Sequence, residues 1–244
     1  MIRRQYFLSA MLLLFAGVGN AQFKKGDRMA GASVANIIFN SGTADISVAS
    51  IGSNKSVITN YNVSIQPSLG WFISENTAIG ASLTINPTGN KTTYEQSNTT
   101  YQSDKVNNFN FGLGSFARHY LHHSGSMMPF GQVSINAGIS NLKTEGFFYG
   151  GSGSSAYKLS YEGNSSGGFF FNATFTAGLT IMLGEFTGLD LYLGYAYSYN
   201  KNTFKKTTLR DNPLERLENE TTTKFTNHGF LLGVGFQVFL HKRK

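Results

Sequence analysis

The sequence predicts an all-β fold: a transmembrane, up-and-down antiparallel β-barrel of eight strands that follows a cleaved signal peptide. Three observations predict it. Apolar residues recur at every second position in several segments, the cores of most of these segments hold no charged residue, and short turns alternate with long polar segments between them. A period of two indicates a strand, because successive side chains of a strand point to opposite faces of a sheet.

The last strand is expected close to the C-terminus, within residues 227–240, whose sequence is NHGFLLGVGFQVFL. From Phe230 onward the larger apolar side chains occupy the even positions, whereas smaller or mixed residues such as Gly233 and Gln237 occupy the odd positions. One face of this strand is therefore continuously apolar. We expect it to close the barrel and to be the segment through which the barrel-assembly machinery recognises the chain.

Seven further strands are predicted by the same alternation, and Pro67 is a bulge candidate because proline is rare in central strands. In chain order the seven strands are 29–39, 61–73, 78–86, 108–120, 130–141, 168–183 and 189–200. Short turns are expected at 74–76, 121–127 and 184–187. The long polar segments 40–60, 87–107, 142–167 and 201–223 are predicted as loops.

This alternation of short turns and long loops is typical of bacterial outer-membrane barrels, which have brief periplasmic turns and longer external loops. An even number of strands returns the chain to the side from which it started, so both termini are expected in the periplasm. Four aromatic residues near strand ends, Trp71, Phe72, Tyr120 and Tyr199, are expected near the membrane interfaces.

A soluble barrel of the lipocalin kind is the main alternative, and the distribution of charge argues against it. Asp, Glu, Lys and Arg are absent from residues 61–73, 78–86, 109–117, 130–141 and 169–183. One face of these segments carries bulky Phe, Tyr, Leu and Ile, and the opposite face carries Gly, Ser, Thr and Asn. A narrow polar interior and an apolar exterior suit lipid, where a closed barrel satisfies every backbone group without water.

The composition and the N-terminus fit an exported membrane protein. Charged residues make up 14% of the chain, against about 25% in soluble domains, and the absence of Cys excludes a disulfide scaffold and a thiolate metal site. Residues 1–21 resemble a signal peptide: Arg3 and Arg4 precede a short apolar run, and a cut is expected after Ala21. The alternative is an N-terminal membrane anchor, but a spanning helix needs about 20 apolar residues and this run is short for one. The barrel domain then spans 22–244, and loss of the two arginines lowers the formal charge from +7 to +5.

Three segments carry a resemblance to a known family. They are LGWFISENTAIGASL at 69–83, FARHYL followed by PFGQVSINAG within 116–138, and the closing strand at 229–240. These segments resemble hairpins of outer-membrane β-barrel proteins of the Bacteroidetes type, small OmpA/OmpX-like or porin-like eight-stranded barrels. The resemblance covers essentially the whole mature chain. It implies an outer-membrane barrel and no particular activity.

No catalytic, cofactor-binding or metal-ligating residue is predicted. His122, His123 and Ser124 could suggest a metal site or a Ser–His pair, but neighbouring turn residues point in different directions and no acidic residue is close in sequence. The Gly-rich stretch 149–155 lacks the strand-to-helix context of a phosphate loop. His119 and His228 are isolated, and each is either a residue near the membrane interface or a ligand. The charged segment 201–223 is typical of a solvated loop. Nucleic-acid binding has no support.

Two charged residues interrupt otherwise uncharged strands. Arg118 shares its parity with Gly112 and Gly114, and Asp190 shares its parity with Tyr192, so all three polar side chains are expected to face the lumen. Arg118 and Asp190 are either strand-end charges that reach periplasmic water or parts of a polar plug. We predict a plug in which Arg118 meets Asp190 directly, or through water or the Tyr192 hydroxyl, because a lone charge in a narrow interior is costly.

Three functions are compatible with this fold. The first is a monomeric, non-enzymatic structural or surface barrel, for envelope integrity or adhesion, in contact with outer-membrane lipid and lipopolysaccharide and without a cofactor. The second is a narrow porin-like channel, although an eight-stranded interior has room for little beyond its own side chains. The third is an enzyme that modifies outer-leaflet lipid, for which no Ser-His-acid set converges at the predicted external strand ends. We favour the first.

Overall fold

The computed structural model describes residues 21–48, 52–96, 99–121, 124–151, 156–165, 167–211 and 213–241. These residues form the strands β1 (Ala21–Gln22), β2 (Arg28–Val48), β3 (Gly52–Phe72), β4 (Thr77–Gln96), β5 (Thr99–Tyr120), β6 (Ser124–Gly125), β7 (Met127–Gly150), β8 (Tyr157–Ser165), β9 (Gly168–Met182), β10 (Thr187–Asp211) and β11 (Leu214–Leu240). Within the described ranges, no helix is long and apolar enough to cross a membrane.

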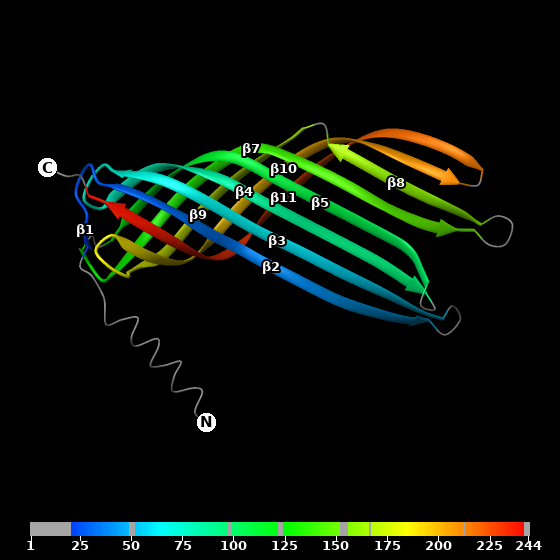
Figure 1. Cartoon of the computed structure of the whole chain (residues 1–244), viewed down its shortest axis with the longest axis horizontal. Coiled ribbons are helices and arrows are strands. Elements are labelled where there is room, and N and C mark those ends of the chain that lie inside the picture. Colours follow the sequence, from blue (N-terminus) through cyan, green and yellow to red (C-terminus); the bar gives the residue numbers. More distant parts are fainter. Residues whose placement is uncertain are drawn as a thin grey trace, which may run out of the picture.

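The long strands form one antiparallel sheet that closes on itself (Figure 1). Its order runs β2-β3-β4-β5-β7-β9-β10-β11, and β11 pairs back onto β2. The predicted all-β, up-and-down antiparallel barrel is therefore confirmed. The sequence predicts eight strands, whereas the described sheet has nine. The additional strand, β8, lies in a segment predicted as a loop, and it fills the place between β7 and β10 beyond the end of β9.

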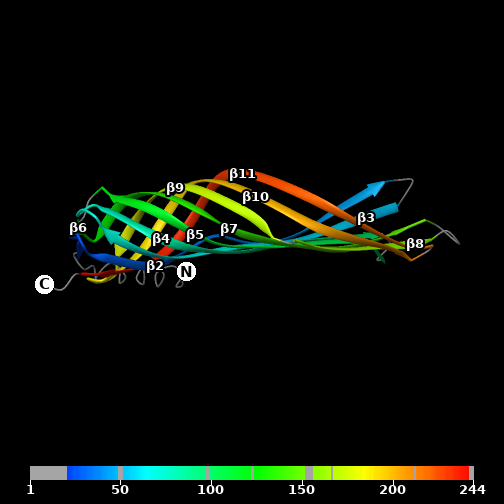
Figure 2. The ribbon, with the colours of Figure 1, turned by 90° about the horizontal axis from the view of Figure 1, so that it is seen from above.

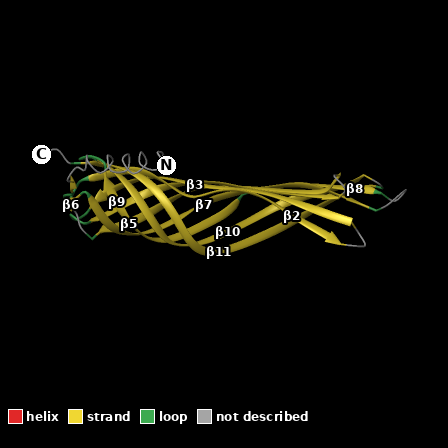
Figure 3. Ribbon diagram, turned by 90° about the horizontal axis from the view of Figure 1, so that it is seen from below, coloured by secondary structure: helices red, strands yellow, loops and turns green. Residues whose placement is uncertain are grey.

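Closure of the ring is confined to the end that holds both described chain ends. There, β11 pairs with β2 only over residues 233–240 and 28–35, whereas β10 and β11 pair from Thr187↔Val238 to Asp211↔Leu214. Beyond this short seam the sheet is open, with β2 and β11 as its two edges. Figures 2 and 3 show the rounded barrel at one end and a flattened extension at the other.

The prediction of four long loops is wrong. Most of the described residues in these segments continue the strands as hairpins. β5 has 22 residues and β11 has 27, whereas about 9–11 residues suffice to cross a bilayer. Polar composition suggested loops, but Thr and aromatic residues favour strands when they pair with a neighbour. Thr203 and Thr222, for example, are cross-strand partners joined by a 3.0 Å hydrogen bond between their Oγ1 atoms.

The prediction of a bulge at Pro67 is also wrong. Pro67 lies opposite Ala32 in β2, and the register between β3 and β4 is the same on either side of it, at Ile65↔Ile85 and Ser68↔Ser82. Register shifts occur elsewhere, between Ala35 and Ile38 in β2 and between Tyr94 and Glu95 in β4.

The barrel is apolar outside and polar inside, as the alternation predicts. Large side chains on the outer face are exposed, for example Leu113 (70%), Phe175 (60%) and Leu232 (76%). Ser134 and Asn136, on the inner face, are buried. This distribution is the reverse of that in a soluble protein, where exposed apolar patches are small.

Two of the four aromatic residues expected at the interfaces lie elsewhere. Trp71 faces outward and is 47% exposed, and Tyr199 belongs to the same outer face on β10, whereas Phe72 and Tyr120 are completely or almost completely buried in the lumen. Because Trp71 and Phe72 are consecutive in a strand, they must point to opposite faces. Tyr120 shares the inward parity of Arg118.

Candidate functional site: a closed polar lumen

A buried ion pair joins opposite walls of the barrel. Arg118 projects inward from β5 and Asp190 from β10, and Arg118 Nη1 lies 2.7 Å from Asp190 Oδ2. The exposed fractions of the two residues are 5% and 0%. A buried charge is tolerated only where its partners are complete, because desolvation is costly.

The carboxylate of Asp190 has two further donors besides Arg118. Thr180 Oγ1 donates to Oδ1 at 2.6 Å, and Gln237 Nε2 donates to Oδ2 at 3.1 Å. These residues come from β9 and β11, the two strands that flank β10. Asp190 is therefore held from both of its neighbouring strands and from across the lumen.

The guanidinium of Arg118 also has further partners besides Asp190. Its Nε donates to Gln132 Oε1 at 2.7 Å, and its Nη1 also donates to the Tyr120 hydroxyl at 3.1 Å. The guanidinium carbon lies 4.1 Å from the centroid of the Phe130 ring, a cation–π arrangement that suits the planar arginine fork.

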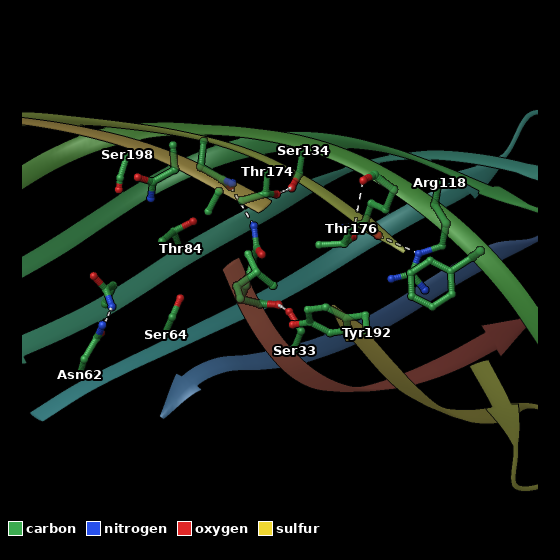
Figure 4. A pocket seen from close by; sticks show the side chains of 18 residues that line it. Ser33, Asn62, Ser64, Thr84, Arg118, Ser134, Thr174, Thr176, Tyr192 and Ser198 are labelled. Carbon is green, nitrogen blue, oxygen red and sulfur yellow. Dashed lines mark hydrogen bonds between the residues drawn. The ribbon is translucent and has the colours of Figure 1, made fainter. Parts of the chain in front are cut away.

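The structure thus brings Arg118 and Asp190 into direct contact, with no group between them. Tyr192, predicted as a possible intermediary, lines the lumen beside Ser33 instead (Figure 4). The backbone of β11 passes close to the Tyr192 ring at Gly233. A Cβ at this position would lie 2.3 Å from the ring, so the glycine makes the close approach possible. Tyr120, expected at the membrane interface, is the tyrosine that contacts the arginine.

A cluster of aromatic rings lies beneath the ion pair and closes the end of the barrel. We call Phe23, Phe72, Tyr120, Phe130 and Phe239 the aromatic floor. All five are buried, and Met29, Met128 and Met182 fill the space around them. Phe23 stands at the centre, with its ring centroid 4.4 Å from that of Phe72, 4.7 Å from Phe239 and 5.0 Å from Tyr120.

The N-terminal segment holds Phe23 in this position. Gly26 N donates to Phe72 O at 2.8 Å, and Phe72 N donates to Asp27 O at 2.9 Å. The Asp27 carboxylate accepts a hydrogen bond from Lys24 N at 2.9 Å and lies 2.8 Å from His241 Nδ1, which joins the two ends of the described chain. The segment therefore crosses the barrel mouth as a strap, with Phe23 directed into the lumen.

A cavity of about 190 Å³ lies on the other side of the ion pair (Figure 4). Its walls are mainly Ser, Thr, Asn and Gln side chains, and among the described residues Arg118 is the single charged group that lines it. A bonded triangle of Gln66, Ser82 and Asn136, with distances of 2.9–3.2 Å, spans three of its strands. The buried Thr84 Oγ1 has no hydrogen-bond partner in the part of the chain that the structure describes. These groups suit water or a small neutral polar solute.

Asparagine side chains also cross the lumen, and two of them, Asn62 and Asn86, line the cavity. The asparagine lattice consists of Asn62, Asn86, Asn108, Asn110, Asn200 and Asn202. Asn110 Oδ1 accepts from both Asn108 and Asn200 at 3.2 Å, which links β5 to β10 across the barrel. Amides serve here as both donors and acceptors, so they can tie the walls together without charge.

The remaining sequence candidates are not gathered at this site. His119 lies 3.0 Å from Thr77 Oγ1 and His228 lies 2.8 Å from the Tyr195 hydroxyl, both on the exposed surface. His122, His123 and residues 152–155 lie outside the described residues, and nothing is described of the Ser124 side chain. In the part of the chain that the structure describes, no group of three or more His, Cys, Asp or Glu residues could hold a metal ion.

Sequence reasoning missed the residues that complete the ion pair. Gln132, Thr180 and Gln237 share the inward parity of Arg118 and Asp190 in their own strands, which was the available signal. Parity cannot give the depth of a residue in the lumen, because depth depends on the stagger between strands.

Comparisons with known proteins add little to this geometry. No protein-family model matches the chain, and no curated protein matches it. Among solved structures, the chain is similar to the outer membrane protein OprG from Pseudomonas aeruginosa, with 14% identity over 93% of this chain and 100% of that chain and a TM-score of 0.36. A bacterial polysaccharide outer membrane secretin gives 9% identity over 90% and 99% and a TM-score of 0.14. At these TM-scores, neither likeness supports a conclusion about this chain.

Proposed function

We propose that this chain is an integral outer-membrane barrel with a closed lumen and a non-enzymatic, structural or surface role. Insertion is supported by the outward apolar band and by the ring of backbone pairs at the closed end, which together meet the requirements of a lipid environment. The resemblance of three segments to Bacteroidetes-type barrels points the same way. The short turns and both described chain ends lie at one end, and we assign that end to the periplasm.

The observation that carries the closed lumen is the succession of barriers along it. Three barriers follow one another along the lumen: the aromatic floor, the pair of Arg118 and Asp190, and the asparagine lattice. The extended hairpins beyond the bilayer are then the parts available to other molecules, as an envelope-integrity or adhesion role requires.

The first prediction concerns insertion and fold. The refolded mature protein should migrate differently on a denaturing gel before and after boiling, because a closed barrel resists detergent until heated. Circular dichroism in detergent should be dominated by strand. A helix-dominated spectrum, or identical migration before and after boiling, would contradict the proposal.

The second prediction concerns conductance. In planar bilayers the refolded protein should give no stable large conductance steps, because the aromatic floor, the ion pair and the asparagine lattice obstruct its lumen. Heat-modifiable migration of the same preparation provides the control that the barrel is folded. Stable large steps would instead favour the narrow-channel alternative, which the neutral polar cavity supports.

A further inference from the structure

We propose that lysines on the outer face of the barrel, just beyond its lipid-facing band, bind the phosphate groups of outer-leaflet glycolipids. The lysine belt consists of Lys91, Lys105, Lys143, Lys201 and Lys224. This inference rests on the proposed outer-membrane location and adds to it a ligand class and a site.

Parity places the belt on the same face as the lipid-facing residues. Along β5, the outward positions run from the exposed Phe109 through Asn107 to Lys105, and along β7 they run from the exposed Ile139 to Lys143. The side chains of the belt therefore point away from the lumen, toward the surroundings of the barrel.

The belt lies at the height of lipid headgroups. Lys105 lies four residues before Phe109 in β5, a rise of roughly 10 Å along a tilted strand. Lys201 lies directly opposite Phe169, another exposed aromatic residue of the outer face. Aromatic residues mark the membrane interface in such barrels, so cations immediately beyond them meet the headgroups.

Lysines are paired with lysines across neighbouring strands. Lys91 lies opposite Lys105, and Lys201 lies opposite Lys224. Like charges directly opposite one another destabilise a sheet. An anion bound between them would remove this repulsion, and lysine is a common ligand of phosphate.

Among the described residues, acidic side chains pair with two lysines of the belt, Lys105 and Lys143. Glu145 lies 2.8 Å from Lys105 and 3.5 Å from Lys143. The Lys105 hydrogen bond lowers the pKa of Glu145 and raises that of Lys105. Within the described ranges, Lys91, Lys201 and Lys224 have no ion-pair partner. These three lysines are the ones most available to an external anion.

A surface groove adjoins the belt and is also cationic. It has a volume of about 870 Å³, and its charged lining residues are Lys91, Lys105, Lys158, Lys205 and Arg216 against Glu145 and Glu162. The excess of cations fits a bulky headgroup that carries more than one phosphate. The position beside the lipid-facing band favours a lipid over a soluble polyanion.

The test compares two double variants that lose the same charge. Lys201→Gln/Lys224→Gln removes an opposed pair of the belt. Lys25→Gln/Lys55→Gln removes two exposed lysines that lie outside the belt. Binding of bisphosphorylated lipid A to the refolded, heat-modifiable protein in detergent is measured by titration. We expect the belt variant to bind roughly tenfold more weakly or worse, and the control variant to bind within about twofold of the wild type.

Three outcomes would overturn the inference: equal weakening in both variants, equal binding of dephosphorylated lipid A, or binding of inorganic phosphate as tight as that of the lipid. A barrel that remains heat-modifiable and non-conducting while giving any of these results would refute the lysine belt and leave the proposed function standing.

Discussion

Replacement of Arg118 by Ala should lower the free energy of unfolding of the refolded barrel by about 3–5 kcal/mol. The variant leaves the Asp190 carboxylate buried without its cation, although the hydrogen bonds from Thr180 and Gln237 can remain. It also removes the cation that lies over the Phe130 ring. Denaturant titration in detergent, followed by tryptophan fluorescence, measures the change.

A double-mutant cycle separates the ion pair from general loss of packing. Asp190→Asn should cause a comparable loss, and the double variant should lose much less than the sum, since either single change already breaks the pair. Lys105→Ala, which breaks an exposed pair with Glu145, is the matched control and should leave the midpoint almost unchanged. If the losses at Arg118 and Asp190 simply add, the two residues do not stabilise each other and the plug interpretation fails.

The second large effect is expected at Phe23. Truncation to Ala should cost about 3–5 kcal/mol, because the ring lies at the centre of the aromatic floor and its neighbours belong to different strands that cannot easily collapse into the space. The measurement is again the unfolding free energy in detergent, and the cavity should also loosen the strap that contains Asp27.

Two variants control for this result. Phe23→Leu retains most of the buried volume and should lose less. Phe225→Ala removes a half-exposed ring of β11 that lies opposite Asn200 and should have a small effect. Equal losses at Phe23 and Phe225 would mean that the strap does not anchor the barrel mouth. Conductance of Phe23→Ala is informative in its own right, because the ion pair should keep the lumen closed even when the floor is weakened.

The sequence alone predicts which face of each strand its side chains occupy. The even positions from Phe230 to Leu240 are large and apolar, and Gln237 lies between them on the face that the structure buries. A lipid-exposed strand needs this alternation along its whole membrane-spanning length, so local sequence is enough to assign faces. For the same reason, Arg118 and Asp190 could be assigned to the lumen from sequence alone.

Tertiary structure decided what those faces meet. The stagger of the strands sets Arg118 of β5 level with Asp190 of β10, and no local pattern encodes that level. Phe23 lies in a segment without clear periodicity, and only closure of the barrel creates the space that its ring fills. The polar segments predicted as loops become strands because their backbone groups find partners across each hairpin. Sequence determined which way each side chain points, because that depends on the two-residue repeat of one strand; the folded barrel determined its height and its partners, because these depend on the register between strands.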